Sequence, residues 1–263
     1  MKFLARWRAR KPAEDAETAY VSERHGVRSL HIGSDTVQSS MRLAKPYDLE
    51  LSYTRSMMAF LLFVQNPKRA LMIGLGGGSL AKFVHYRLPA TRLTVIEVSP
   101  QVVAIARQYF QVPDDVPPRF QVIVADGSEY VSRDDVSADV LFVDGYDADS
   151  HAEELANRSF YCACRARLAP GGVLVVNLWG GDRLFTTLLK RIASAFPDGT
   201  LSLPAERPGN VIVLAFRDQP TPFEWTALTE RGKLLEDEYG LEFGRFVENL
   251  RKMNEHDASR LYP

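Results

Sequence analysis

The sequence predicts one α/β domain whose mostly parallel sheet carries helices on both faces, with a small β extension before it and a helical tail after it. Three observations predict this fold class. Between residues 69 and 178, apolar runs alternate with amphipathic segments, as in parallel strands joined by helices. A glycine-rich turn follows the first run, and an acidic residue ends each of the next three. The length of 263 residues suits one large domain with small additions.

The first zone, residues 1–55, carries short alternating runs with turn residues between them, such as residues 27–32. Alternation of apolar and polar side chains is typical of strands with one solvated face, so we expect a small β extension here. Residues 56–66 are mostly apolar and predict a buried helix. This helix leads into the main domain, which we place at residues 56–220.

Five apolar runs predict the parallel strands, at residues 70–73, 92–97, 121–125, 139–143 and 172–178. Their valine, isoleucine and leucine content is typical of strands that are covered on both faces. Pro-Gly-Gly at residues 170–172 predicts a turn leading into the fifth strand. The helices between the strands are expected to begin near Ser79, Ser99, Ser128 and Ser159. Serine hydroxyls accept hydrogen bonds from free N–H groups at a helix start, so these serines are candidate N-caps.

The C-terminal part completes the sheet. Residues 183–196 predict a long helix. Residues 200–203 and 210–216 predict an antiparallel hairpin around Pro208-Gly209, which gives a seven-stranded sheet. The remaining residues, 221–263, are charged and helical in pattern, so we expect a helical tail.

The composition argues against several classes of partner. The chain is 46% apolar and 25% charged with a formal net charge of -1, so nothing in its charge predicts binding to nucleic acid or to an anionic membrane. Its apolar stretches stay below the ~18 residues of a membrane span, and its first residues lack the apolar core of a signal peptide. The basic residues between Lys2 and Lys11 are expected to form a solvated tail.

The two cysteines, Cys162 and Cys164, lie two positions apart in a predicted helix. This spacing points them to different faces, so we expect packing rather than a disulfide or a pair of metal ligands. Such thiols suit a reducing cytoplasm. The sequence has no histidine and cysteine cluster with ligand spacing, so we expect no metal site.

The glycine-rich turn contains Gly74, Gly76, Gly77 and Gly78, directly after a strand and before a helix. Glycines at such a place let the backbone pass close to a ligand, and the helix start offers free N–H groups. An ordinary tight turn is the alternative. A phosphate cradle is not favoured, because the Walker pattern needs Gly-Lys-Ser/Thr and this chain has Gly-Ser-Leu.

Three acidic residues end successive strands: Glu97, Asp126 and Asp144, of which the last two precede Gly127 and Gly145. The carboxyl ends of parallel strands meet at the crevice where such sheets bind ligands, and Glu97 has the place of a ribose-binding acid. Clustered carboxylates repel a pyrophosphate but attract a sulfonium or an ammonium group. The pattern favours a nucleoside site for an S-adenosyl-type cofactor, although Glu97 alone also fits NAD. Helix capping is the alternative for a single acid.

The segment from Asp144 to His151 reads Asp-Gly-Tyr-Asp-Ala-Asp-Ser-His and lies where we expect the reacting end of the ligand. A carboxylate here can orient an incoming amine and take its proton as it attacks a carbon next to a sulfonium. A solvated acidic loop is the alternative, and His151 is expected at the surface.

The motifs resemble those of the spermidine synthase family of aminopropyltransferases, over about residues 38–216. Residues 37–40 are similar to a glutamine-containing segment that ends the family's small β domain, and residues 53–57 to its Tyr-His-Glu-Met run. The glycine turn falls on Gly-Gly-Gly-Asp-Gly-Gly. Residues 143–148 fall on Val-Asp-Ser-Thr-Asp-Pro.

The resemblance implies a methyltransferase-like Rossmann domain behind the β domain. It makes Asp144 the catalytic carboxylate and places the amine substrate against Asp147, Tyr146, Tyr53 and Gln38. It makes Glu97 the ribose-binding acid and puts Asp126 and Gly127 beside the adenine. The cofactor would be decarboxylated S-adenosylmethionine and the product methylthioadenosine, with no metal, and the enzyme would be a homodimer.

Three departures from the family pattern bear on the reaction. Gly77 stands where the family has the acid that steers the aminopropyl ammonium, Thr54 replaces the histidine after Tyr53, and residues 204–209 lack the family's amine-contacting tyrosine. Gly-Leu-Gly-Gly-Gly-Ser-Leu is also similar to the turn of methyltransferase-like proteins of the same superfamily. Methyl transfer from S-adenosylmethionine, giving S-adenosylhomocysteine, is therefore the second hypothesis. A non-catalytic descendant that binds a nucleoside or a partner protein is the third.

Overall fold

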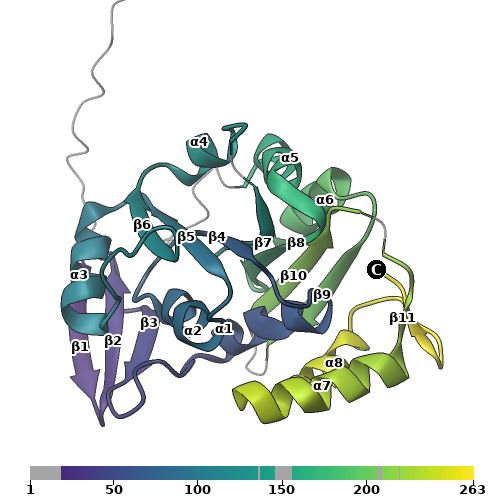
Figure 1. The fold of residues 1–263 in the computed structure, drawn as a ribbon, viewed down its shortest axis with the longest axis horizontal. Coiled ribbons are helices and arrows are strands. Elements are labelled where there is room, and N and C mark those ends of the chain that lie inside the picture. The colour runs from purple at the N-terminus through teal and green to yellow at the C-terminus, as the bar shows by residue number, and fades with distance from the viewer. Residues whose placement is uncertain (1–18, 136, 146–155, 206–208, 219) are drawn as a thin grey trace, which may run out of the picture.

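The computed structural model describes residues 19–135, 137–145, 156–205, 209–218 and 220–263. Figure 1 shows how these residues are arranged: a small N-terminal sheet lies beside a large central sheet, and helices cover both faces of the large sheet. The last two helices run beneath the central sheet in this view.

The central sheet has seven strands in the order β6-β5-β4-β7-β8-β10-β9. The first five in this order are parallel, β10 is antiparallel to β8, and β9 is antiparallel to β10. Their bounds are β4 Arg69–Ile73, β5 Arg92–Glu97, β6 Phe120–Val124, β7 Ala138–Val143, β8 Leu168–Trp179, β9 Thr200–Pro204 and β10 Asn210–Phe216. The predicted mostly parallel sheet with its C-terminal antiparallel hairpin is therefore confirmed.

The start of β8 contradicts the sequence prediction. Residues 170–172, predicted as a turn, lie inside β8, which begins at Leu168. Ala138 pairs with Leu168 and Val140 with Val173, so β8 advances five residues while β7 advances two. The extra residues form a bulge, in which Gly171 has a φ of +73° that glycine adopts without strain. A turn and a bulge use the same residue types, which is why the turn prediction was wrong.

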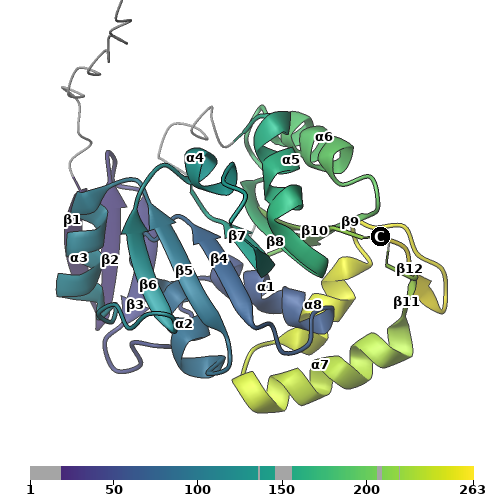
Figure 2. The ribbon, with the colours of Figure 1, turned by 45° about the horizontal axis from the view of Figure 1, so that its top comes forward.

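Helices cover the two faces of the sheet (Figure 2). A large cluster of buried apolar side chains fills the space on each side. One side holds α1 Ser52–Met57, the 3₁₀ helix η1 Met58–Leu62, α2 Ser79–Arg87, α3 Pro100–Phe110, α7 Trp225–Tyr239 and α8 Phe243–Leu250. The other side holds α4 Gly127–Val131, α5 Arg158–Arg167 and α6 Phe185–Ala195. The predicted long helix is thus confirmed as α6, slightly shorter at both ends.

One of the four serine N-caps is confirmed and three are wrong. Ser99 caps α3, because its Oγ accepts a hydrogen bond from the backbone N–H of Val102 at 3.3 Å. Gly78, Asp126 and Asn157 are the caps of α2, α4 and α5. The other three serines lie in the first turns of their helices, where serine is also tolerated, so the prediction placed these caps too late.

The buried helix predicted at residues 56–66 is two short helices, α1 and η1, which begin at Ser52 and end at Leu62. The apolar residues 57–62 are all buried, so the predicted burial is confirmed. The prediction began late because the first turn of α1 is polar in sequence and lacks the apolar pattern.

The N-terminal sheet contains β1 Ala19–Arg24, β2 Val27–Ile32 and β3 Val37–Arg42, paired antiparallel in that order. The predicted β extension is confirmed for these residues. Leu30 and Met41 of this sheet form a small buried cluster with Phe110 of α3. The N-terminal sheet is therefore fastened to the end of α3.

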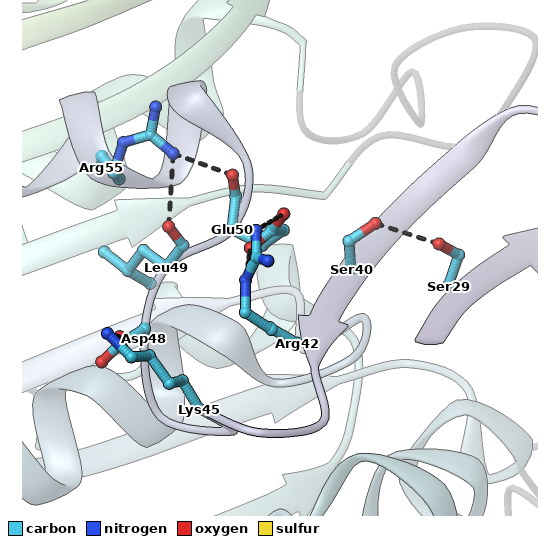
Figure 3. Close-up of polar contacts among 8 residues, drawn as sticks. All are labelled: Ser29, Ser40, Arg42, Lys45, Asp48, Leu49, Glu50 and Arg55. Carbon is cyan, nitrogen blue, oxygen red and sulfur yellow. Dashed lines mark hydrogen bonds and ion pairs between the residues drawn. The ribbon is translucent and has the colours of Figure 1, made fainter. Parts of the chain in front are cut away.

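The connection from β3 to α1 is held by polar contacts, which Figure 3 shows. Arg42 binds both carboxylate oxygens of Glu50, through Nε at 3.0 Å and Nη2 at 2.8 Å. Arg55 Nη1 donates to the carbonyl oxygens of Leu49 at 3.3 Å and Glu50 at 2.8 Å. The strand and the helix are thereby held at a fixed position relative to each other.

The predicted helical tail is confirmed as α7 and α8, but these helices belong to the core. Leu235, Phe243 and Leu250 are buried in the same apolar cluster as α1 and α2. The sequence pattern showed the charged faces of these helices and not the surface that they cover.

Three further predictions concern thiols, membranes and metals. Cys162 and Cys164 lie on α5 as predicted, where Cys164 is buried and both thiols are free. In the described ranges, no helix is long and apolar enough to cross a membrane. The same residues contain no group of three or more His, Cys, Asp or Glu side chains that could hold a metal ion.

Lys82 of α2 is fully buried between the N-terminal sheet and the end of α3. Its Nζ donates to the carbonyl oxygen of Phe110 at 2.6 Å and contacts the Sδ of Met41 at 3.0 Å. An ammonium group at the C-terminus of a helix interacts favourably with the helix dipole. Burial nevertheless lowers the pKa of Lys82 to about 8.

The buried Lys82 ammonium predicts that stability depends on pH. Its pKa is about 8 in the folded chain against 10.5 for an ordinary lysine, so the folded chain loses this proton first as the pH rises. Between pH 8 and 10.5 the unfolded chain therefore binds more protons than the folded chain. The free energy of unfolding should rise by roughly 1–3 kcal/mol over this pH range. Urea denaturation of the wild type and of Lys82→Met measures it. The rise should be missing in Lys82→Met, and equal pH profiles would contradict the assignment.

Candidate active site

The glycine turn after β4 approaches the end of β7 closely. Gly74, Gly76 and Gly78 have φ values of +93°, +52° and +70°, which glycine adopts without strain. A Cβ on Gly74 would overlap the backbone carbonyl of Asp144. The backbone N–H of Asp144 also donates to the carbonyl oxygen of Ile73 at 2.9 Å. The turn and Asp144 are therefore in contact through their backbones. This agrees with the prediction that the carboxyl ends of the parallel strands meet at one edge of the sheet.

Gly77 and Gly78 are buried, whereas Gly74 and Gly76 are partly exposed. A Cβ on Gly77 would lie 2.6 Å from Ser39 Oγ and 3.0 Å from Phe110 Cδ1. The space in which a side chain at position 77 would begin is thus filled from β3 and α3. A side chain at position 77 would therefore require Ser39 or Phe110 to move.

Glu97 ends β5 and is buried with 8% of its surface exposed. Its Oε2 accepts from the backbone N–H of Leu75 at 2.9 Å, and its Oε1 accepts from that of Ser99 at 2.9 Å. The carboxylate therefore joins the glycine turn to the start of α3. Each oxygen keeps acceptor capacity that a hydroxyl group can use.

Asp126 follows β6 and is the N-cap of α4. Helix capping, the alternative role for a strand-end acid, therefore applies to this residue. Its Oδ1 accepts from the backbone N–H groups of Ser128 at 2.7 Å and Glu129 at 3.1 Å. A Cβ on Gly127 would lie 2.5 Å from Ile73 Cγ2, so this glycine allows close packing of α4 on β4.

Asp144 follows β7 and carries a carboxylate held by two side chains. Asn177 of β8 donates from Nδ2 to Asp144 Oδ1 at 2.9 Å, and the Tyr53 hydroxyl of α1 is hydrogen-bonded to the same carboxylate. Burial raises the pKa of Asp144, and the hydrogen bonds from Asn177 and Tyr53 partly oppose this rise. Both partners stabilise the ionised form.

Tyr53 brings α1 into contact with β7. Burial raises the pKa of Tyr53 well above its ordinary value, and the negative charge and hydrogen bond of Asp144 raise it further. The phenol is therefore a neutral donor. The hydroxyl also donates to the carbonyl oxygen of Gln38 on β3 at 3.4 Å, so its one hydrogen is shared between Asp144 and Gln38, and α1, β3 and the end of β7 meet here.

The other predicted substrate residues, Tyr146 and Asp147, lie outside the described residues, as does His151. Thr54, which replaces the family's histidine, is buried and donates from Oγ1 to the carbonyl oxygen of Leu51 at 2.7 Å. Its hydroxyl is therefore used within its own helix start.

Sequence reasoning missed three residues at the ends of β8 and β10. Asn177 is 4% exposed within an otherwise apolar strand, and Asn210 donates from Nδ2 to Asn177 Oδ1 at 2.9 Å. Trp179 is 50% exposed and packs over Gly181 and Gly209. Alternation along β8 puts Trp179 on the same face as Asn177. A single amide in an apolar run was the one signal that pointed to Asn177.

The chain matches a family model described as "Spermine/spermidine synthase domain" over residues 50–202. It is 42% identical over 256 residues to a polyamine aminopropyltransferase of Chromobacterium violaceum, covering 97% of this chain and 98% of that relative.

Two solved structures resemble this fold. A probable spermidine synthase from Corynebacterium glutamicum has a TM-score of 0.68 at 19% identity, covering 91% of this chain and 93% of that one. Human methyltransferase-like protein 13, in complex with SAH, has a TM-score of 0.65 at 25% identity, covering 79% of this chain and 96% of that one.

The contact between Gly74 and Asp144 predicts a large effect of one methyl group. Gly74→Ala places a Cβ on the Asp144 carbonyl and strains a φ of +93°, so it should lower the free energy of unfolding by roughly 3 kcal/mol or more. Gly171→Ala is the matched control, because φ is +73° there and the space is open. It should cost roughly 1–2 kcal/mol. Urea denaturation compares the two, and equal losses would contradict the close approach.

Proposed function

Since this chain belongs to the spermine/spermidine synthase family and is a transferase, we propose that it moves an aminopropyl group from decarboxylated S-adenosylmethionine to a small amine. The observation that carries the proposal is the Asp144 carboxylate, held by Asn177 and Tyr53 beside the glycine turn. A homodimer, which rests on the resemblance, and a cytoplasmic location, which rests on the two free thiols, are part of the same proposal.

We place the nucleoside between the glycine turn and the acids of β5 and β6. Glu97 would bind the ribose hydroxyls, because backbone N–H groups already fix the direction of its carboxylate. Asp126 and Gly127 would lie beside the adenine. Gly74 and Gly76, the partly exposed glycines, would face the cofactor, and the buried Gly77 and Gly78 would support the turn. The absence of Cβ atoms and the clustered carboxylates fit an S-adenosyl cation.

When bound, the sulfonium supplies an electrophilic carbon and leaves as the neutral thioether of methylthioadenosine. Asp144 would orient the acceptor amine and take its proton as the new C–N bond forms and the C–S bond breaks. Tyr53, as a neutral phenol, would keep the carboxylate in place by donating to it. Asp147 and Tyr146 would add contacts to the amine, as the resemblance implies.

Methyl transfer remains the second candidate, and Gly77 is the observation that favours it. A neutral turn next to a helix start does not repel the carboxylate of ordinary S-adenosylmethionine. Ser39 and Phe110 occupy the place where an acidic side chain at position 77 would begin. The chain would then resemble the human methyltransferase-like protein in reaction as well as in fold.

Calorimetric titration with each cofactor, followed by mass analysis of the products, tests the proposed reaction. Decarboxylated S-adenosylmethionine should bind at least about tenfold more tightly than S-adenosylmethionine, a difference of about 1.4 kcal/mol. The acceptor amine should gain an aminopropyl group. Tight binding of S-adenosylmethionine alone, with methylated product, would replace the proposal with methyl transfer.

The role of Asp144 predicts a fall of kcat at low pH and a loss of activity on substitution. The pKa of Asp144 lies above the usual 3.8, so as the pH falls this carboxylate gains its proton at a higher pH than an ordinary aspartate does. Because the proposed reaction needs the ionised carboxylate, kcat should begin to fall at that higher pH. Asp144→Asn should lower kcat by roughly 10²–10⁴-fold and remove the fall of kcat at low pH, with cofactor affinity nearly unchanged. Glu129→Gln, which removes an exposed acid of α4, is the charge-matched control. Full activity in Asp144→Asn would contradict the catalytic role of this carboxylate.

A further inference from the structure

Two asparagines connect Asp144 to the far strands of the sheet. Asn177 Nδ2 donates to Asp144 Oδ1 at 2.9 Å, and Asn210 Nδ2 donates to Asn177 Oδ1 at 2.9 Å. The three side chains come from the end of β7, from β8 and from the first residue of β10. They form one chain of hydrogen bonds in which every donor points toward Asp144.

The pairing of β8 with β10 places these side chains on one face of the sheet. Asn210 lies opposite Trp179 and Ile212 lies opposite Asn177, so Asn210 is the diagonal neighbour of Asn177. Diagonal neighbours on one face lie about 7–8 Å apart, within reach of polar side chains that extend toward each other. The antiparallel β10 strand, which has no part in the nucleoside site, thus touches the partner of the catalytic carboxylate.

The Asn177 amide has two ends of similar shape and opposite hydrogen-bonding character. Its NH₂ group can donate to a carboxylate, whereas its carbonyl oxygen would meet the carboxylate as a second acceptor. A half-turn about the last side-chain bond exchanges the two ends. The donor supplied by Asn210 satisfies the carbonyl end, so the observed orientation is favoured at both ends of the amide.

We propose that Asn210 is a positioning residue that fixes the orientation of the Asn177 amide and so keeps an N–H donor on Asp144. The inference rests on the proposed function of Asp144 as the group that receives the amine's proton. Asn210 itself would touch neither cofactor nor acceptor. Its effect on the reaction would pass entirely through Asn177.

A double-mutant cycle tests this dependence. Asn210→Leu removes the outer donor, and Asn177→Leu removes the amide that it orients. Each single variant should raise the pKa of Asp144, measured by NMR titration of its side-chain carboxyl carbon, by about 0.5–1 pH unit. Each should lower kcat by about 5–30-fold and leave cofactor affinity unchanged. In the Asn177→Leu background, Asn210→Leu should change kcat by less than about twofold and should not raise the pKa of Asp144 further.

Asn249→Leu is the matched control, since Asn249 of α8 is a buried asparagine whose Nδ2 donates to the carbonyl oxygen of Pro204 on β9 at 3.2 Å. It should leave the pKa of Asp144 unchanged. Equal effects of Asn210→Leu in both backgrounds, or no effect on that pKa, would overturn the positioning role. The NMR titration requires no turnover, so it tests the positioning role even if the chain does not transfer an aminopropyl group. Turnover by the wild type tests the proposed function separately.

Discussion

The contact between the glycine turn and Asp144 is the constraint on which the rest of the site depends. β4 and β7 are adjacent parallel strands, and the turn leaves β4 so close to Asp144 that no side chain fits on Gly74. The same turn presents the Leu75 N–H to Glu97 at the end of β5. One backbone path therefore sets the distance between the acid that would hold the nucleoside and the acid that would receive the proton.

The three described carboxylates at this edge, Glu97, Asp126 and Asp144, are held by N–H or O–H donors. Backbone donors hold Glu97 and Asp126, whereas the side chains of Asn177 and Tyr53 hold Asp144. Backbone donors keep a carboxylate fixed, and donors on side chains can be tuned by their own partners. Asp144, the acid assigned to chemistry, is the one held by side chains. The N-terminal sheet and α1 serve the site by bringing Tyr53 to it.

The sequence predicted the sheet and the strand-end acids because both follow from local patterns. Apolar runs marked the strands, and Glu97, Asp126 and Asp144 stood directly after them. The contacts of Asn177 and Asn210 could not be predicted, because they depend on the register between β8 and β10 and not on spacing along the chain. The bulge at residues 170–172 was missed for a related reason, since only pairing with β7 distinguishes it from a turn.

The most direct test of the central claim is a crystal structure of this chain with methylthioadenosine and an acceptor amine. We expect ribose hydroxyls within about 3 Å of the Glu97 carboxylate and the acceptor nitrogen at hydrogen-bonding distance from Asp144. Asn177 and Tyr53 should remain bonded to that carboxylate. An acceptor nitrogen bound away from Asp144, with the nucleoside in place, would contradict the claim that this carboxylate receives the proton.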